Sequence, residues 1–352
     1  MIPDPLPLTH LEAMTDERGL FEHARGAVPR RQLGYCVDDV ARGLALTARE
    51  DGRSDAAAAL ADRYLRFVEA AIADDGRVHN RRAADGRWAD EPGTGDWWGR
   101  ALWGLGAAAR WSARPPVRDR ALRAFDRAAQ ARSPWLRARC FAALGAADVA
   151  AAAETDAEPG VSPGSAAAAR RVLRDAAAAV AACCSDGARG WRWPEERLRY
   201  ANAAIPEALI AAGHALGDTR CLDRGLELLD FLVAIETAPD GHLSLTPVGG
   251  RGPRDTAPAF DQQPIEAAAL AQACLRAFEV TRDGRWLPPL RAAWAWFEGR
   301  NDRGIALFDP ETGAGYDGLT PTGRNDNRGA ESTLAALGTL QCVSRVAAVS
   351  SV

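Results

Sequence analysis

The fold is decided by the stretch Gly34-Tyr35-Cys36-Val37-Asp38-Asp39, which runs straight into the apolar segment 40–50. Five more polar or aromatic clusters lead into alanine-rich segments in the same way: Asp96-Trp97-Trp98-Gly99-Arg100, Ser133-Pro134-Trp135, Tyr200-Ala201-Asn202, Phe260-Asp261-Gln262-Gln263-Pro264 and Asn325-Asp326-Asn327-Arg328-Gly329-Ala330-Glu331. The clusters recur every 39 to 67 residues, which leaves room for a helical hairpin and a loop in each interval. A repeat of this kind indicates an array of helical hairpins.

Two kinds of helix alternate between the clusters. The first of each pair is apolar on nearly all sides and is predicted to be buried; these helices span 40–50, 101–109, 138–153, 203–216, 265–278 and 333–343. The second is amphipathic and is predicted to be an outer helix; these span 56–73, 117–131, 166–184, 220–235 and 286–297. The segment around 8–14 is expected to supply the missing outer piece. The pattern predicts an all-α fold, the (α/α)6 toroid, formed by residues 1–352 as a single domain.

The links between these helices differ in length. Links from an inner to an outer helix are mostly short, whereas links from an outer helix to the next inner helix are long. Segments 76–80 and 86–88 are predicted to form the arms of a short β-hairpin, and 242–245 another strand. Because function usually lies on long loops held by a rigid scaffold, we expect the site where the inner helices begin.

Composition and charge exclude several classes of function. The net charge is -4, so no basic field favours binding to nucleic acid or to an anionic membrane. All 43 cationic residues are arginine, which excludes the lysine Schiff base of pyridoxal enzymes and class I aldolases. No stretch approaches about 18 uninterrupted apolar residues, so no membrane span is expected.

Cysteine usage indicates a reducing compartment. The seven cysteines have no CxxC spacing and lie mostly inside apolar helical patterns: Cys36, Cys140, Cys183, Cys184, Cys221, Cys274 and Cys342. We expect them to be small buried side chains with free thiols. The N-terminal residues lack the basic and apolar regions of a secretory signal. Together these features predict a cytoplasmic protein.

The residues at or near the starts of the inner helices suit a sugar. Indole faces cover the C–H faces of a pyranose, while carboxylates and amides bind its hydroxyl groups. The candidate substrate-binding residues are Tyr35, Arg42, Asp96, Trp97, Trp98, Arg100, Trp193, Asn202, Glu207, Gln262, Gln263, Glu266, Asp317 and Asn327. Two alternatives stay open: the aspartates and asparagines cap their helices by accepting first-turn amide protons, and the tryptophans pack in the core.

The adjacent aspartates Asp38 and Asp39 are the sharpest candidates for catalysis. Both cannot cap one helix, yet both can reach a ligand placed over the helix end. Like charges so close are expected to raise one pKa, which prepares one acid and one base. Asp261 and Glu331 are further candidates for either role. Arg42, one turn later, can pair with either aspartate, and this pairing is the structural alternative.

Other chemistries lack their motifs. No GxGxxG or GxxxxGK[ST] stretch follows a strand, so no nucleotide cofactor is expected. The five histidines show neither HExxH nor another metal-binding spacing, so no metal is expected. Ser332 does not lie in a GxSxG elbow, and no strand precedes it.

Four blocks of the sequence resemble a known family. They are Gly34-Tyr35-Cys36-Val37-Asp38-Asp39-Val40-Ala41-Arg42, Asp96-Trp97-Trp98-Gly99-Arg100-Ala101-Leu102-Trp103, Phe260-Asp261-Gln262-Gln263-Pro264-Ile265-Glu266-Ala267 and Asn327-Arg328-Gly329-Ala330-Glu331-Ser332-Thr333-Leu334. They are similar to a bacterial (α/α)6 domain, often fused to or encoded beside glycosyltransferases, in the six-hairpin glycosidase-like superfamily. The resemblance runs from about His10 to Leu340. It implies a role in carbohydrate metabolism and an association with a glycosyltransferase. It does not imply glycosyltransferase catalysis, because the chain lacks paired Rossmann domains.

Two branches of the superfamily offer a comparison of residues. Asp38 and Asp39 are similar to the consecutive aspartates of endo-α-1,6-mannanases, which implies one nucleophile, one acid/base and a mannoside as substrate. The sugar 2-epimerases share the toroid but use paired histidines at the rim, for which His214 and His242 are poor candidates.

The function predicted from the sequence is hydrolysis of an oligosaccharide or small glycoside by carboxylate acid/base catalysis. Two alternatives stay open: a non-hydrolytic sugar enzyme, such as an epimerase or a lyase, and a sugar-binding partner of a glycosyltransferase. The expected ligand is a carbohydrate, and neither nucleic acid nor a membrane is an expected partner.

Overall fold

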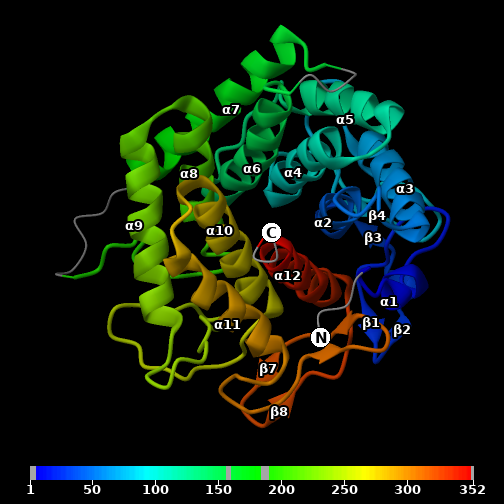
Figure 1. Cartoon of the computed structure of the whole chain (residues 1–352). Helices are drawn as coiled ribbons and strands as arrows, with labels where there is room; N and C mark the ends of the chain where they lie inside the picture. The colour runs from blue at the N-terminus through cyan, green and yellow to red at the C-terminus, as the bar shows by residue number, and fades with distance from the viewer. Residues whose placement is uncertain (1–4, 156–159, 184–189, 350–352) are drawn as a thin grey trace.

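The protein consists of an inner ring of helices surrounded by an outer ring of helices. The computed structural model describes residues 5–155, 160–183 and 190–349. Six inner helices surround a central axis (Figure 1): α2 (Val37–Ala48), α4 (Asp96–Trp111), α6 (Leu136–Ala152), α8 (Ala204–Leu216), α10 (Pro264–Thr281) and α12 (Ala330–Val349). The outer helices are α1 (Thr9–Ala13), α3 (Asp55–Ala71), α5 (Pro115–Ala128), α7 (Pro163–Ala182), α9 (Thr219–Glu236) and α11 (Leu287–Phe297). The predicted (α/α)6 toroid is confirmed.

The ring closes between its first and last inner helices. Each inner helix packs on the next, and α12 packs on α2. At one end of this junction Arg42 donates to Glu331, and at the other the side-chain amide of Gln341 donates to the backbone oxygen of Leu46 and to Glu50. The short helix α1 packs against α12, as expected for the missing outer piece.

Small residues allow the inner helices to approach closely. A Cβ added to Gly145 of α6 would collide with the backbone oxygen of Leu102 in α4, and one added to Gly106 of α4 would collide with the backbone oxygen of Gly145. Alanine supplies most of the remaining contact surface of α6, which has an almost unbroken run of buried residues. The high alanine content therefore has a packing role, since bulkier side chains would widen the ring.

A side-chain cap at the first turn distinguishes three of the outer helices, α3, α7 and α9, from the inner helices α2, α4, α6, α8 and α10. No side chain caps the first turn of α2, α4, α6, α8 or α10. By contrast, Ser54, Ser162 and Asp218 accept a first-turn amide proton of α3, α7 and α9. Capping is therefore not the role of Asp96, which lies inside the first turn of α4, or of Asn202 and Asp261, which precede the N-cap residues of α8 and α10. Carboxylates in a first turn are favoured by the positive end of the helix dipole.

The long links carry four pairs of two-residue strands, each pair antiparallel. They are β1 (Ala24–Arg25) with β2 (Val28–Pro29), β3 (Tyr35–Cys36) with β4 (Arg81–Arg82), β5 (Phe308–Asp309) with β6 (Ala314–Gly315), and β7 (Leu319–Thr320) with β8 (Gly323–Arg324). The predicted hairpin is partly wrong: Trp88 does bridge to Arg82, but the first arm is β4 and not 76–80. Segment 242–245 forms no strand and has only single bridges at Leu243.

The structure bears on two further expectations from the sequence. In the part of the chain that the structure describes, no helix combines the length and apolar character needed to cross a membrane. Four cysteines, Cys36, Cys140, Cys274 and Cys342, are buried with free thiols, Cys221 is partly exposed with a free thiol, and Cys183 is partly exposed. Cys184 lies outside the described residues.

Candidate active site

Arg42 of α2 lies at the centre of a group of carboxylates. Its Nη2 atom is 2.6 Å from Asp38 Oδ2 and 2.9 Å from Asp39 Oδ1 on the same helix. The same nitrogen is 2.9 Å from Glu331 Oε2, in the first turn of α12. The spacing of α2 explains the first two contacts, since residues three and four apart share a helix face. The third contact follows from closure of the ring.

A second arginine completes the surroundings of Asp38. Arg100 of α4 places its Nε atom 2.9 Å from Asp38 Oδ1, and its guanidinium carbon lies 4.0 Å from the centre of the Phe141 ring. Burial would raise the pKa of Asp38, but Arg100 and Arg42 outweigh it and hold the pKa below its usual value. The Asp38 side chain is 23% exposed, so this anion can still meet a ligand.

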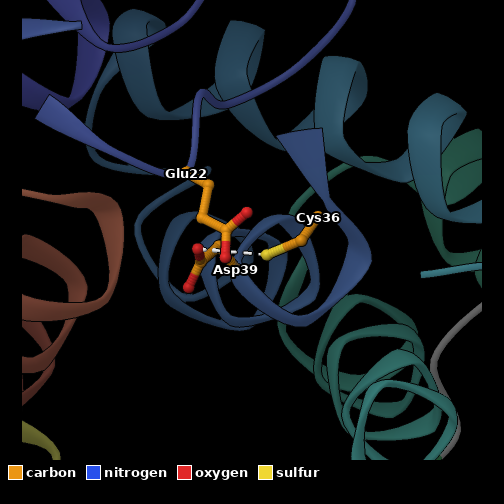
Figure 2. Close-up of side chains that lie close together, drawn as sticks. All are labelled: Glu22, Cys36 and Asp39. Carbon is orange, nitrogen blue, oxygen red and sulfur yellow. Dashed lines mark hydrogen bonds between the residues drawn. The ribbon is translucent and has the colours of Figure 1, made fainter. Parts of the chain in front are cut away.

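Asp39 points into the protein. Its side chain is only 4% exposed, and its Oδ2 atom accepts a hydrogen bond from the Cys36 thiol at 3.1 Å (Figure 2). Burial raises the pKa of Asp39 to about 7; Arg42 opposes this shift, and Asp38 and Glu331 reinforce it. The pKa values of the two aspartates are therefore shifted in opposite directions, as expected, but only Asp38 can reach a ligand. The sequence could not show this, because both residues stand at the same helix start.

One group in the described residues has the spacing of a metal site. The sulfur of Cys36 and carboxylate oxygens of Asp39 and Glu22 lie within 4.8 Å of one another (Figure 2). Both carboxylates already have guanidinium partners, since Arg81 pairs with Glu22 and Arg42 with Asp39. Burial and the nearby carboxylates raise the pKa of Cys36 well above its usual value, so its thiol donates a hydrogen bond to Asp39.

We expect Asp39→Asn to flatten the pH dependence of stability in the acidic range. The Asp39 carboxyl keeps its proton up to a pKa of about 7 in the folded protein, against 3.8 as the usual value. The folded state therefore binds more protons, and this group's contribution to stability, present below about pH 4, is lost as the pH rises through 7. Asparagine imitates the protonated form.

Urea unfolding of both proteins at pH 5 and pH 8 measures this effect. From pH 5 to pH 8, the free energy of unfolding of the wild type is expected to fall by roughly 2–4 kcal/mol more than that of the variant. Asp119→Asn, which breaks an exposed ion pair with Arg123, is the control and is expected to follow the wild type. Equal losses in the wild type and in Asp39→Asn would contradict the assignment.

Asp96, like Asp38 and Glu331, is a carboxylate that is partly exposed at the start of an inner helix. It begins α4, one turn before Arg100. Burial raises its pKa; Arg100 and, more weakly, Arg137 oppose the shift, while Asp38 reinforces it. Within the described residues, its carboxylate has no hydrogen-bond partner. Asp38 and Asp96 thus lie near the same arginine with pKa values shifted in opposite directions.

A buried network joins the starts of α6, α8 and α10. Arg137 of α6 donates to both oxygens of Glu195, at 2.9 and 2.7 Å, and to the backbone oxygen of Tyr200 at 2.6 Å. Asn202 donates to Glu266 through its side chain and its backbone N–H. Burial and the neighbouring Glu236 raise the pKa of Glu266 to about 8. Asn202 and Glu266, both predicted to bind substrate, are buried and hold one inner helix to the next.

Several other predicted residues have hydrogen-bond or ion-pair partners outside the Asp38 group. Glu207 is buried and pairs with Arg276 of α10 at 3.0 Å. Gln262 is buried and donates to Asp302, which also contacts His242. Gln263 lies beside Gly318, Asp317 accepts from the N–H of Gly329, and Asn327 accepts from the N–H of Gly26. Asp261 is exposed, and none of its side-chain contacts joins it to the Asp38 group in the described residues.

Most of the predicted aromatic residues are not open to a ligand. Tyr35, Trp98 and Trp193 are buried; Tyr35 donates to Asp16, Trp98 donates to the backbone oxygen of Ala128, and Trp193 stacks near Phe231. Trp97 is partly buried and donates to the backbone oxygen of Val78. The aromatic rings exposed on the described surface are instead those of Trp135 and Tyr200, in two of the six clusters. Neither residue was predicted to bind substrate, and membership of a cluster at a helix start was the signal that could have pointed to them.

Cavities run along the axis of the ring. A narrow cavity of about 50 Å³ is lined by Arg42, Arg100, Trp103, Phe141 and Glu207, among others. It is too small for a sugar ring, so a sugar would have to bind above Arg42 and Arg100, on the side of the long loops. A larger cavity of about 870 Å³ opens at the opposite end, lined by the last turns of α10 and α12. Several of its charged groups are paired: Arg345 with Glu279, Arg110 with Asp148 and Arg276 with Glu207.

Comparison with known proteins identifies the architecture. No protein-family model and no curated protein sequence matches the chain. Among solved structures, it is similar to a sugar epimerase from a ruminal bacterium, with 14% identity, a TM-score of 0.66, and coverage of 96% of this chain and 95% of that one. The protein has the fold of sugar-processing enzymes.

Other structures with this toroid fold differ in reaction. Cellobiose 2-epimerase from Bacillus thermoamylovorans gives a TM-score of 0.69 with 10% identity, covering 97% of this chain and 96% of that one. An α-mannanase from Bacteroides thetaiotaomicron gives 0.64 with 10% identity, covering 97% and 95%. Identities this low establish the shared toroid alone, so a proposal for the reaction must come from the side chains.

Proposed function

We propose that this protein is a sugar-processing enzyme that hydrolyses glycosides, with Asp96 as proton donor and Asp38 as the anionic partner. The observation that carries the proposal is the opposite shift of two accessible carboxylates. Asp38 is held anionic by Arg100 and Arg42, whereas burial favours the protonated form of Asp96. Paired carboxyl groups with separated pKa values are the requirement for acid-assisted cleavage of a glycosidic bond.

In the proposed reaction, Asp96 gives its proton to the oxygen that leaves the anomeric carbon. The bond between this oxygen and the anomeric carbon breaks, and positive charge develops on the sugar ring. Asp38 then acts in one of two ways: its carboxylate bonds to the anomeric carbon and is displaced by a water that the deprotonated Asp96 activates, or it accepts a proton from the water that attacks this carbon directly. Water supplies the new hydroxyl group, so one water molecule is consumed for each bond cleaved.

Other members of the group hold Asp38 in place or can bind the substrate. Arg42 binds Asp38, Asp39 and Glu331 together, so it fixes the anion and the two inner helices that carry the group. Glu331 is 40% exposed on its side chain, which suits it to bind a sugar hydroxyl. Asp39 is proposed to act as a positioning residue, because its buried carboxyl contacts Arg42 and Cys36 and not the open side.

The histidines do not favour epimerisation as the reaction. His10 is buried and hydrogen-bonded to the backbone oxygen of Arg328, and His79 stacks on Trp88. His242 lies between Asp240 and Asp302, and His214 lines the large cavity at the opposite end of the ring. His23, the fifth, pairs with Glu22. In the described part of the chain, no histidine has a hydrogen bond or ion pair with Asp38, Asp96 or Glu331, so no pair is placed to move a proton at a ring carbon there.

A screen of glycosides with the purified protein tests the proposed function. Products are followed by NMR, which separates a hydrolysed sugar from an isomerised or unsaturated one. Release of a reducing sugar with consumption of water supports the proposal. An isomerised or unsaturated product would replace it with a non-hydrolytic reaction, and saccharide binding without turnover would indicate a sugar-binding protein.

The substitution Asp96→Asn is expected to lower kcat/KM roughly 10²–10⁴-fold for a substrate with a poor leaving group. The loss should be far smaller for a glycosyl fluoride, because fluoride departs without a proton. The same variant should lose the basic limb of the pH–rate profile, which reports the acid. Equal losses on both kinds of substrate would show that Asp96 is not the proton donor.

A further inference from the structure

The exposed apolar side chains of this protein gather on its loop side. The large ones in the described residues are Val28, Leu33, Trp135, Tyr200 and Val248. Every one of them lies on a link that leads from an outer helix to an inner one, where the candidate active site opens. Trp135 is 64% exposed and Tyr200 is 40% exposed, although aromatic rings of this size are normally buried.

The backbones that carry these two rings are fixed by buried polar groups. The buried Ser133 accepts from the N–H of Trp135 at 3.1 Å and donates to the backbone oxygen of Thr94 at 2.6 Å. Arg137, two residues after Trp135, donates to the backbone oxygen of Tyr200 at 2.6 Å and lies 5.5 Å from the centre of its ring. Both rings are therefore exposed on a rigid support.

The same contacts place the two rings on one side of the site. Ser133 ties the start of α6 to Thr94, two residues before Asp96. Arg137 is close enough to Asp96 to affect its pKa, and α4, which begins with Asp96, packs between α6, which follows Trp135, and α2, which carries Asp38. The rings thus neighbour the proposed proton donor and not the proposed anion.

We propose that Trp135 and Tyr200 form the binding surface for the leaving-group sugar of the substrate. This inference rests on the proposed function, since the proton donor lies on the leaving-group side of the bond it cleaves. A flat exposed ring covers the apolar face of a pyranose, and Glu195, which is 18% exposed and pairs with Arg137, can bind its hydroxyl groups. The substrate is accordingly at least a disaccharide.

Two substrates that differ only in the leaving group test the inference. One is the disaccharide identified by the glycoside screen, and the other is the fluoride of the same glycosyl unit. Trp135→Ala and Tyr200→Ala are each expected to lower kcat/KM for the disaccharide about tenfold and to leave the fluoride within twofold. Val248→Ala is the matched control: this side chain is 69% exposed on the same side, and both substrates should be unaffected.

Equal losses on both substrates, or no loss on either, would overturn the inference while leaving the hydrolase proposal intact. If the protein hydrolyses none of the screened glycosides, calorimetric titration with the screen's mono- and trisaccharides tests separately whether the two rings bind a sugar. Trisaccharide binding that Trp135→Ala weakens about tenfold supports a sugar-binding surface even though the hydrolase proposal has failed. Unchanged or absent trisaccharide binding overturns it, and the exposed rings would then be assigned to a protein partner.

Discussion

Asp38→Asn is expected to lower kcat by roughly 10²–10⁴-fold without unfolding the protein. Asparagine has nearly the same shape, so its oxygen can still accept from Arg42 or Arg100, which contact the carboxylate at 2.6 and 2.9 Å. What disappears is the negative charge that would stabilise the developing positive charge on the sugar. Steady-state kinetics on the best glycoside, with circular dichroism as a check of folding, measures the effect.

The control for this variant is Asp326→Asn, which alters another aspartate on the loop side. That side chain is 80% exposed and pairs only with Arg324 among the ion pairs of the described residues. Its substitution is expected to leave kcat within twofold of the wild type. A kcat for Asp38→Asn within tenfold of the wild type would remove Asp38 from the reaction and leave Glu331 as the next candidate for the anion.

Arg42→Met is expected to destabilise the protein by about 3–5 kcal/mol at pH 7, because it removes the cation of a buried ion-pair group and leaves its carboxylates unpaired. The guanidinium is 9% exposed and neutralises carboxylates of two inner helices. Without it, Asp38 retains Arg100, but Asp39 and Glu331 lose the guanidinium that they share. The free energy of unfolding from urea titration measures the loss.

The size of this effect should depend on pH in a defined direction. Lowering the pH to 5 protonates more of the Asp39 carboxyl and removes one of the repelling charges, so the variant should recover part of its stability relative to the wild type. Arg123→Met, which removes a 65% exposed partner of Asp119, is expected to change stability by less than about 1 kcal/mol. A similarly small change in Arg42→Met would show that the group contributes little to folding.

The arrangement of helices could be predicted from the sequence because burial leaves a regular pattern. An inner helix such as α6 touches protein on all sides and is apolar all round, whereas an outer one such as α5 keeps its arginines on one wet face. The positions at which helices begin were predicted less accurately. The sequence predicts that this inner helix begins at residue 101, yet α4 begins at Asp96, because acidic residues are favoured in a first turn.

The candidate site could be predicted only in part. Convergence of Asp38, Asp96 and Glu331 near one axis follows from the ring, so the pattern that predicts the fold also brings these three residues together. The direction of a single side chain does not follow from it. Trp193 and Trp135 both precede an inner helix, but one is buried against Phe231 and the other is exposed. Loop conformation decides between them, and loops have no periodicity from which it could be predicted.

The junction between α2 and α12 has a consequence for how the protein becomes active. The contact between Arg42 and Glu331 joins residues 289 positions apart, so the ribosome makes one side of the site long before the other. Until the final helix emerges, Arg42 lacks Glu331 and the inner helices have an open seam. A nascent chain of five complete hairpins would therefore hold Asp38 and Asp96 without a finished site, and activity should arise only when the last helix closes the circle.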